Sequence, residues 1–277
     1  MPDLLKAAIL GIVQGLTEFL PVSSTGHLVL LEKGMDISQD RFGLSFDAAI
    51  HLGTLLAILV YFWSTVLRLL TAWVGSIRAR RWDIDTDSRL AWLIVIGTVP
   101  AAVIGFLFES TVEEKLRNPA LVATMLILFS GALVLAELLG KRRLQASQLG
   151  ATAALFIGLA QAVALIPGVS RSGITISAGL LAKLERQQAA IFVFLLSAPI
   201  VAGAGLKKVY DVVKEARNGL LGREDLQFFL VGFILAAVVG YLTIHFMLAY
   251  LRGHSLYAFV VYRVALGVIV LAVVWLT

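Results

Sequence analysis

Long apolar segments that carry almost no charge are the feature that most constrains this chain. A helix needs about 20 predominantly apolar residues to cross the hydrocarbon core of a bilayer. Inside lipid, every backbone N–H and C=O group must be satisfied within the protein, so segments of this length cross as helices. We therefore expect six membrane-spanning helices, over residues 48–67, 91–108, 119–136, 188–206, 226–251 and 256–277.

The composition agrees with an integral membrane protein. Hydrophobic residues make up 59% and charged residues 15% of the chain, whereas soluble domains have about half and about a quarter. The formal net charge is +5, but Lys and Arg gather in loops beside the predicted spans, so no nucleic-acid partner is indicated. The absence of cysteine excludes disulfides, metal thiolates and cysteine nucleophiles. The N-terminal apolar run leads directly into a polar motif, so we expect mature structure there and not a cleaved signal.

Two shorter apolar segments are predicted to enter the membrane without crossing it. Residues 7–20 would form a helix about 21 Å long, shorter than a bilayer core of about 30 Å, before Pro21 interrupts it. A short helix from His27 to about Glu32 follows, which makes the unit a re-entrant hairpin. A second hairpin is expected over residues 150–182. The predicted fold is an all-α integral membrane protein with six transmembrane helices and two re-entrant helical hairpins.

The turn of the first hairpin concentrates polar residues at membrane depth. Its sequence, QGLTEFLPVSSTGH, extends from Gln14 to His27. Ionisable side chains at this depth cost about 3 kcal/mol or more, so they are kept mainly where they line a cavity or do chemistry. Helix capping would explain one serine, but not Glu18 and His27 as well. We interpret this stretch as part of a functional site.

A second copy of the motif follows 147 positions later and reads QAVALIPGVSRSGIT. Ser24 of the first copy is replaced by Arg171 in the second. Gln14 and Gln161 are equivalent, and could either bond each other across a pseudo-twofold axis or serve the site. One hairpin plus three spans gives each half an odd number of crossings, so the halves should have opposite orientations. We therefore predict a single membrane domain, residues 1–277, built of two inverted repeats, 1–140 and 141–277.

The distribution of Lys and Arg sets the expected orientation. Segments 68–89 and 141–143 are rich in basic residues, which favours the cytoplasmic side. Segment 109–118 has three acids against two basic residues, so we expect it outside. Segment 207–225, external in this scheme, has five basic residues and argues weakly against it. Both termini are then external, and the two hairpin turns meet near the middle of the membrane.

Together the two turns could hold a phosphate group. Helix N-termini and successive backbone N–H groups bind anions, and the planar guanidinium of Arg171 can bond phosphate through two N–H groups. Glu18 could act as an acid or base, or hold Mg²⁺ or Ca²⁺, which prefer oxygen ligands. Ser24 and His27 are candidate nucleophiles. The expected substrate-binding residues are Gln14, Ser23, Thr25, Gly26, Ser170, Ser172, Gly173 and Thr175.

Other polar residues inside apolar segments are interpreted as structural. A lone intramembrane histidine is more often hydrogen-bonded structure than a catalyst, and this applies to His51 and His245. Arg263 and Glu137 have similar predicted depths, which favours an ion pair between them.

The sequence resembles the bacterial undecaprenyl-diphosphate phosphatase family, also called the bacitracin-resistance protein family. The motifs GLTEFLPVSSTGH and PGVSRSGIT carry the resemblance, which covers essentially the whole chain. It implies hydrolysis of undecaprenyl diphosphate, with a divalent cation, to the monophosphate lipid carrier of cell-wall synthesis. It also implies a multi-pass protein of the bacterial cytoplasmic membrane whose site is reached from the external side. The catalytic residues that it implies are Glu18, Ser24, His27 and Arg171, with Glu18 as the metal ligand.

Two positions depart from the family pattern. Members commonly have a carboxylate four residues before Glu18, where this chain has Gln14, so tight metal binding by two carboxylates is not expected. His51 stands where Gln is usual. The nucleophile stays open between Ser24, His27 and water. We favour Ser24, with His27 as the base that takes its proton.

A transporter or lipid translocator is the alternative function. Paired re-entrant hairpins in an inverted repeat are a recurring plan of secondary transporters, and fold alone does not decide function. A candidate nucleophile, an acid/base pair and an arginine clamp together favour phosphoryl transfer. The expected partners are a polyprenyl diphosphate and membrane lipids, and a homodimer is left open.

Overall fold

The computed structural model describes residues 3–35, 44–115, 118–217 and 223–276, and within them it contains helices and connections but no β-strand. The helices are α1 (Asp3–Phe19), α2 (Ser24–Gly34), α4 (Leu44–Tyr61), α5 (Trp63–Arg78), α6 (Thr86–Lys115), α7 (Pro119–Leu139), α8 (Ala151–Val163), α9 (Arg171–Leu181), α10 (Arg186–Arg217), α11 (Arg223–Tyr250) and α12 (Tyr257–Leu276), with a short 3₁₀ turn, η1 (Ala146–Gln148), before α8.

The predicted multi-pass, all-α architecture is confirmed. Five helical segments among the described residues are long and apolar enough to cross a membrane, and the pair α4 and α5 brings the number to six if it counts as one span. The five segments are Thr86–Phe108, Pro119–Leu139, Arg186–Gly205, Leu226–Tyr250 and Tyr257–Leu276.

The remaining predicted span, residues 48–67, is not one straight helix. α4 ends at Tyr61, α5 begins at Trp63, and the two are bent by 84° relative to each other. Residues on both sides of the break are uncharged, so the sequence does not reveal the bend.

Contacts with α6 explain the direction of α5. Its buried residues are Leu69 and Ser76, and the Trp92 side chain of α6 donates its ring N–H to Ser76 Oγ at 2.9 Å. The rings of Trp73 and Trp92 meet edge to face, with centroids 5.8 Å apart. α5 is therefore an amphipathic helix that packs on α6 and does not continue α4.

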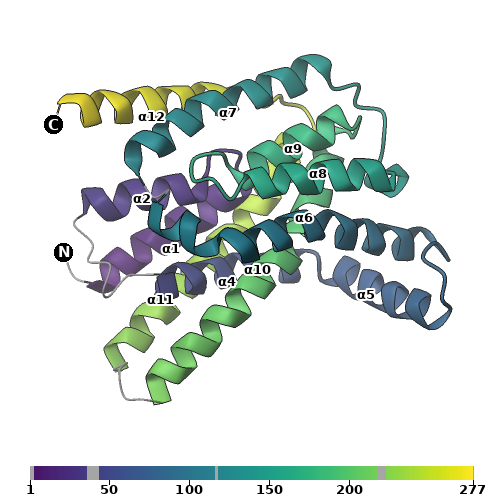
Figure 1. The fold of residues 1–277 in the computed structure, drawn as a ribbon, viewed down its shortest axis with the longest axis horizontal. Coiled ribbons are helices and arrows are strands. Elements are labelled where there is room, and N and C mark those ends of the chain that lie inside the picture. Colours follow the sequence, from purple (N-terminus) through teal and green to yellow (C-terminus); the bar gives the residue numbers. More distant parts are fainter. Residues whose placement is uncertain (1–2, 36–43, 116–117, 218–222, 277) are drawn as a thin grey trace.

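The turns of the two short helical hairpins lie next to each other. α1 and α2 form the first and α8 and α9 the second, and in Figure 1 the two pairs lie beside each other near the middle of the molecule. Ser172 Oγ at the start of α9 donates to the backbone oxygen of Leu20 in the first turn at 2.8 Å. The turns of two segments far apart in the sequence are thus in direct contact.

The chain ends and the basic connections lie on opposite sides. Figure 1 shows both termini at the left, and the α5 to α6 turn and the α7 to α8 connection at the right. Arg80 and Arg81 lie in the first of these connections, and Arg142 and Arg143 in the second. This separation agrees with the charge pattern used to assign the two sides.

Close glycine contacts hold each hairpin against a long helix. A Cβ atom added at Gly11 of α1 would lie 2.5 Å from the backbone oxygen of Gly232 in α11, and one at Gly158 of α8 would lie 2.3 Å from that of Gly97 in α6. The backbones therefore approach as closely as small residues allow in membrane helices. These two contacts use equivalent positions of the two halves, but the division into inverted repeats remains a prediction.

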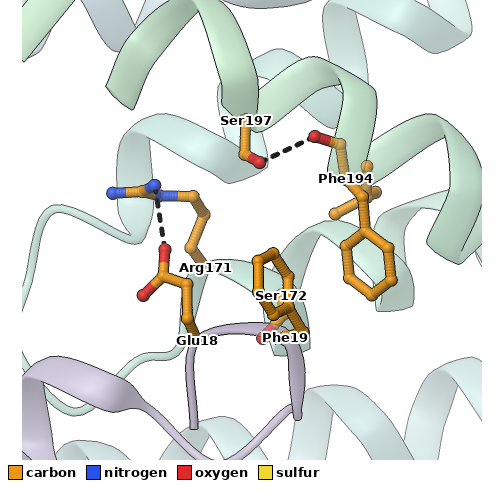
Figure 2. A pocket seen from close by; sticks show the side chains of 7 residues that line it. Glu18, Phe19, Arg171, Ser172, Phe194 and Ser197 are labelled. Carbon is orange, nitrogen blue, oxygen red and sulfur yellow. Dashed lines mark hydrogen bonds and ion pairs between the residues drawn. The ribbon is translucent and has the colours of Figure 1, made fainter. Parts of the chain in front are cut away.

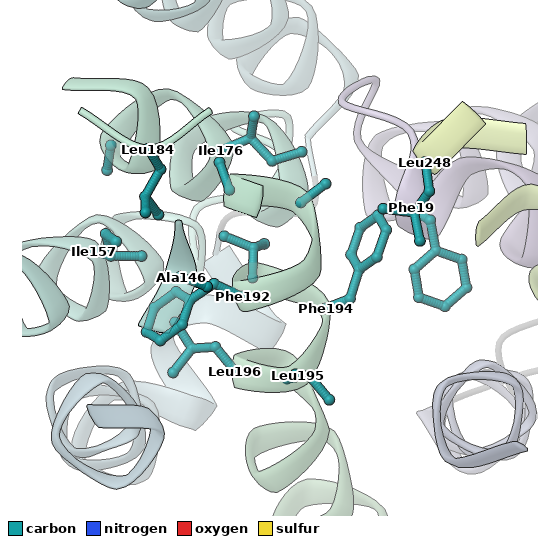
Figure 3. Close-up of a cluster of buried hydrophobic side chains, with 14 of the residues drawn as sticks. Phe19, Ala146, Ile157, Ile176, Leu184, Phe192, Phe194, Leu195, Leu196 and Leu248 are labelled. Atoms are coloured by element: carbon teal, nitrogen blue, oxygen red, sulfur yellow. The ribbon is translucent and has the colours of Figure 1, made fainter. Parts of the chain in front are cut away.

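The largest apolar core surrounds α10. Phe192, Phe194 and Leu196 of this helix are almost fully buried, and Figure 3 shows them among side chains from several other helices. Phe19, the last residue of α1, packs edge to face on Phe194 with ring centroids 5.2 Å apart. Because Glu18 directly precedes Phe19, this contact helps to fix the end of the first hairpin helix.

The predicted ion pair between Glu137 and Arg263 is wrong. Glu137 accepts hydrogen bonds from Arg186 Nε at 2.9 Å and from the backbone N–H of Leu256 at 2.9 Å, and it also pairs with Arg142. Similar predicted depth in the membrane did not imply contact, because Arg142 and Arg186 already pair with the Glu137 carboxylate.

Candidate active site

The two hairpin turns have the same local structure. Ser23 and Ser170 both have φ of 75°, a region that non-glycine residues rarely occupy. Each is the N-cap of the following helix: Gly26 N–H donates to Ser23 Oγ at 3.3 Å and Gly173 N–H to Ser170 Oγ at 3.1 Å. The residue after each cap, Ser24 or Arg171, therefore begins a helix at the turn.

Glu18 is the centre of the polar cluster. Its Oε2 accepts hydrogen bonds from Ser24 Oγ at 2.5 Å and from Gln14 Nε2 at 3.1 Å. Its Oε1 lies 3.3 Å from Nη1 of Arg171 on the opposite hairpin, and Figure 2 shows this pair. The Glu18 side chain is only 8% exposed. A buried carboxylate needs such compensation, and here both hairpins supply it.

A polar cavity opens beside this cluster. Its lining comes from both turns, and the residues are Glu18, Ser23, Ser24, Thr25, Ala164, Ile166, Pro167, Gly168, Ser170 and Arg171. The first residues of α2 and α9 both lie on its wall, so the positive ends of two helix dipoles meet there. Such a cavity suits an anion such as a phosphate group.

The same ion pair also lines a second cavity. Glu18 and Arg171 line it as well, but its remaining walls are Phe19, Ser172, Val193, Phe194 and Ser197, and Figure 2 shows most of these side chains. The ion pair thus lines both a polar cavity and a cavity whose other walls are mainly apolar.

The His27 side chain forms its hydrogen bonds with residues other than Ser24. Its Nδ1 lies 2.8 Å from the backbone oxygen of Ser23, and its Nε2 lies 2.6 Å from the hydroxyl of Tyr262 in α12. A carbonyl oxygen can only accept, so Nδ1 carries the proton and Nε2 of the neutral ring accepts from the tyrosine. The hydroxyl of Ser24 is therefore bonded to Glu18, and His27 is bonded to Tyr262.

The sequence profile of the bacitracin resistance protein BacA family matches residues 7–269. The chain belongs to this family. Among its relatives, the undecaprenyl-diphosphatase of Rubrobacter xylanophilus is 48% identical over 276 residues and covers 100% of both chains. That of Moorella thermoacetica is 41% identical over 272 residues, with 98% of each chain covered. That of Mycolicibacterium smegmatis is 44% identical over 268 residues, covering 97% of this chain and 95% of the relative.

Most of the residues expected from the BacA family motifs meet at the two turns. Glu18, Ser24 and Arg171 are in direct contact, and Gln14 bonds Glu18 and does not bond Gln161. Ser23, Thr25 and Ser170 line the polar cavity. Gly26 and Gly173 contribute the capping N–H groups, and Ser172 bridges to the first turn.

Thr175 lies outside this group. Its hydroxyl donates to the backbone oxygen of Arg171 at 2.5 Å within α9, and the residue is fully buried. It supports the helix start and is absent from the cavity walls. The family motif marks the residue, but its side chain points along the helix.

Two further residues join the site from outside the motifs. His51, interpreted as structural, has its Nε2 3.9 Å from Glu18 Oε2, while its Nδ1 lies 2.7 Å from the backbone oxygen of Asp47. Its departure from the BacA family pattern was the only signal in the sequence. Nothing in the sequence indicated that Tyr262 contacts His27, because 235 positions separate the two residues. His245 keeps a structural role, with Nδ1 3.4 Å from the Tyr61 hydroxyl.

The donors available for a metal ion are few. Within the described residues no group of three or more His, Asp or Glu side chains is arranged to hold one. However, Oε1 of Gln14 is buried without a hydrogen-bond partner, one helical turn from Glu18. An amide oxygen and a carboxylate are donor types that suit a hard cation, which would take its other ligands from water and substrate.

Proposed function

We propose that this protein hydrolyses undecaprenyl diphosphate to undecaprenyl phosphate and inorganic phosphate, which regenerates the lipid carrier of cell-wall synthesis. The observation that carries the proposal is the 2.5 Å hydrogen bond from Ser24 Oγ to Glu18, made beside an arginine of the opposite hairpin. Family membership and relatives named undecaprenyl-diphosphatase support it.

In this proposal the terminal phosphate occupies the polar cavity. Arg171 exchanges its contact with Glu18 for the phosphate oxygens, to which a guanidinium can donate through two N–H groups. The N-terminal ends of α2 and α9 add positive potential at the same place. The second, mainly apolar cavity lies next to the diphosphate, where the first part of the polyprenyl tail can contact Phe19 and Phe194.

The chemical step follows from the contact between Ser24 and Glu18. Glu18 takes the hydroxyl proton while Ser24 Oγ attacks the terminal phosphorus, and the bond from phosphorus to the bridging oxygen breaks. Lipid phosphate leaves and takes that proton from Glu18. Water then attacks the phosphoserine and gives a proton to Glu18, which returns it to Ser24 Oγ as inorganic phosphate is released. Glu18 is better placed than His27 to act as the base, because it already accepts a hydrogen bond from the Ser24 hydroxyl.

His27 is proposed to hold the first turn in its reactive shape. The proton on Nδ1 bonds the carbonyl of Ser23, the residue that precedes Ser24. Attack by His27 itself or by water, with Ser24 only orienting the phosphate, is the competing mechanism. The competing mechanism can be distinguished from the covalent serine mechanism by the activity of Ser24→Ala, because it does not require the Ser24 hydroxyl.

We also propose that Glu18 and Gln14 Oε1 hold a divalent cation, Mg²⁺ or Ca²⁺, together with the diphosphate. When bound, the cation neutralises charge on the phosphate oxygens. Gln14 keeps its amide N–H on Glu18 Oε2 and so orients the carboxylate. The single carboxylate means that the substrate must contribute much of the affinity for the ion.

The location that we propose is the bacterial cytoplasmic membrane, with the polar cavity reached from the external side. The basic connections on the side opposite to the termini support this orientation. In the variant Arg81→Cys, which changes an exposed residue, an impermeant thiol reagent should not label the cysteine in intact cells. Rapid labelling there would show that the protein has the opposite orientation.

The test of the proposed function is phosphate release by purified protein in detergent, with undecaprenyl diphosphate and Mg²⁺ or Ca²⁺. Continuous release that depends on protein and metal is expected. A transporter without phosphatase activity would release none, because it breaks no phosphoanhydride bond, and its transport is not detected once detergent has removed the second compartment. A folded protein that releases no phosphate with either ion would contradict the proposal.

A further inference from the structure

Arg263 lies in the second turn of the apolar helix α12 and is fully buried, with 0% exposure. Its guanidinium makes five hydrogen bonds. Within the described residues, the acceptors are four carbonyl oxygens and one hydroxyl, with no carboxylate among them. A charge buried in this way is retained only where its hydrogen bonds are needed, since apolar side chains of similar volume usually serve packing as well or better.

Three of the acceptors belong to the turns of the two hairpins. Nη1 donates to the oxygen of Pro21 at 3.2 Å in the first turn. Nη2 donates to the oxygens of Gly168 and Val169, both at 3.1 Å, in the second turn. One rigid guanidinium thus bonds both turns at once.

The remaining two bonds attach the guanidinium to α7. Nε donates to Ser130 Oγ at 3.2 Å and to the oxygen of Leu126 at 3.3 Å. The turns are therefore tied to a pair of long helices, α7 and α12, and not only to each other.

The bonded carbonyls lie close to the strained residues of the site. The oxygen of Val169 belongs to the peptide group directly before Ser170, and that of Pro21 lies two residues before Ser23. Positive φ at a serine costs on the order of 1 kcal/mol or more and persists where surrounding contacts fix the backbone. Arg263 supplies such contacts at both turns.

We propose that Arg263 is a positioning residue that holds the two hairpin turns in register, so that Ser24 and Arg171 face the same phosphate group. The inference builds on the proposed function, which requires both residues at one phosphorus. Arg263 does not touch the polar cavity and acts through the two turns. Without it, each hairpin keeps its own N-cap, but the polar contacts between the turns are reduced to the bond from Ser172 to Leu20 and the pair of Arg171 with Glu18, which Arg171 gives up for the phosphate in the proposed function.

Arg263→Lys tests the proposal, because lysine keeps the charge but cannot bond three carbonyls of two turns in one plane. Misplacing reacting groups by about 1 Å can cost about 10²-fold in rate. We therefore expect kcat for undecaprenyl diphosphate to fall by about that factor while KM changes less than threefold. Ser130→Ala, which removes an acceptor on α7 but none on the turns, is the matched control and should stay within about threefold of the parent in kcat.

Hydrogen exchange measured by mass spectrometry gives a readout that does not require activity. In Arg263→Lys, amide exchange should rise in both turn peptides, 20–28 and 166–174, while peptide 63–78 of α5 stays unchanged. Loosening of both turns with a parental α5 supports the proposal. Parental exchange in either turn, or a kcat within threefold of the parent, overturns it, and so does a general rise of exchange over the whole protein. If the parent releases no phosphate, the proposed function fails, but the exchange result still decides the role of Arg263.

Discussion

Ser24 donates its hydroxyl hydrogen to Glu18 across 2.5 Å, although the two residues lie on opposite sides of a hairpin turn. The same carboxylate faces Arg171 of the other hairpin at 3.3 Å. A hydroxyl, a carboxylate and a guanidinium, which we propose as nucleophile, base and phosphate-binding group, therefore meet at one point of an otherwise apolar interior. This arrangement explains why both turns carry polar residues at membrane depth.

The covalent serine mechanism predicts that Ser24→Ala loses activity to background while the protein stays folded and still binds substrate. Ser24→Cys should retain at most a little activity. Glu18→Gln should lower kcat by about 10²- to 10⁴-fold, since it removes the proposed base. Phosphate release across pH is the measurement, with Ser64→Ala on α5 as the control. A Ser24→Ala rate within about tenfold of the parent would move the chemistry to water or His27.

Arg171→Lys is expected to lose most activity although it keeps the positive charge. Lysine is a point charge and cannot donate two parallel hydrogen bonds to a phosphate. Loss of a preorganised contact of this kind costs about 10²- to 10³-fold in turnover. The control is Arg68→Lys, whose exposed pair with Asp87 lies on the surface of α5 and α6. Near-normal turnover of Arg171→Lys would reduce Arg171 to a general counter-ion.

Gln14→Glu is expected to lower the divalent-ion concentration needed for half-maximal activity. A second carboxylate next to Glu18 attracts a cation more strongly in a site of low dielectric constant. Ion binding to the substrate-free protein, followed by calorimetry, should strengthen in the same variant. Gln161→Glu, the equivalent change in the second hairpin, is the control and should leave the metal dependence as it is. If Gln14→Glu also leaves it unchanged, Gln14 does not face the ion.

Local sequence patterns were sufficient to predict the hairpins and the meeting of their polar turns. An apolar segment too short to cross, followed by Pro21 and a serine-rich turn, specifies a hairpin through near neighbours in the chain. The motifs around Ser24 and Arg171 are local as well, and the second copy indicated that the turns should meet. Their contact in the structure follows the prediction, because the polar groups of each turn satisfy those of the other.

Contacts between distant residues could not be predicted in the same way. The bend between α4 and α5 depends on how Trp73 and Ser76 pack on α6, and the flanking residues carry no charge that would mark it. Arg263 was paired with Glu137 from similar depth alone, whereas its acceptors are backbone carbonyls, which every residue carries. Hydrogen bonds to backbone carbonyls therefore cannot be predicted from residue types.

Tyr262 provides the last prediction, since its hydroxyl donates to His27 Nε2 at 2.6 Å and the two rings are stacked with centroids 5.7 Å apart. Tyr262→Phe removes the hydrogen bond and keeps the ring. A neutral hydrogen bond contributes about 0.5–1.5 kcal/mol, so the rate should fall about two- to tenfold. The effect should vanish in a His27→Ala background, because Tyr262 acts through His27 and coupled residues are not additive. Tyr241→Phe, whose ring packs on Tyr61 away from the turns, is the control. Equal losses from Tyr262→Phe with and without His27 would show that the tyrosine acts independently of the histidine.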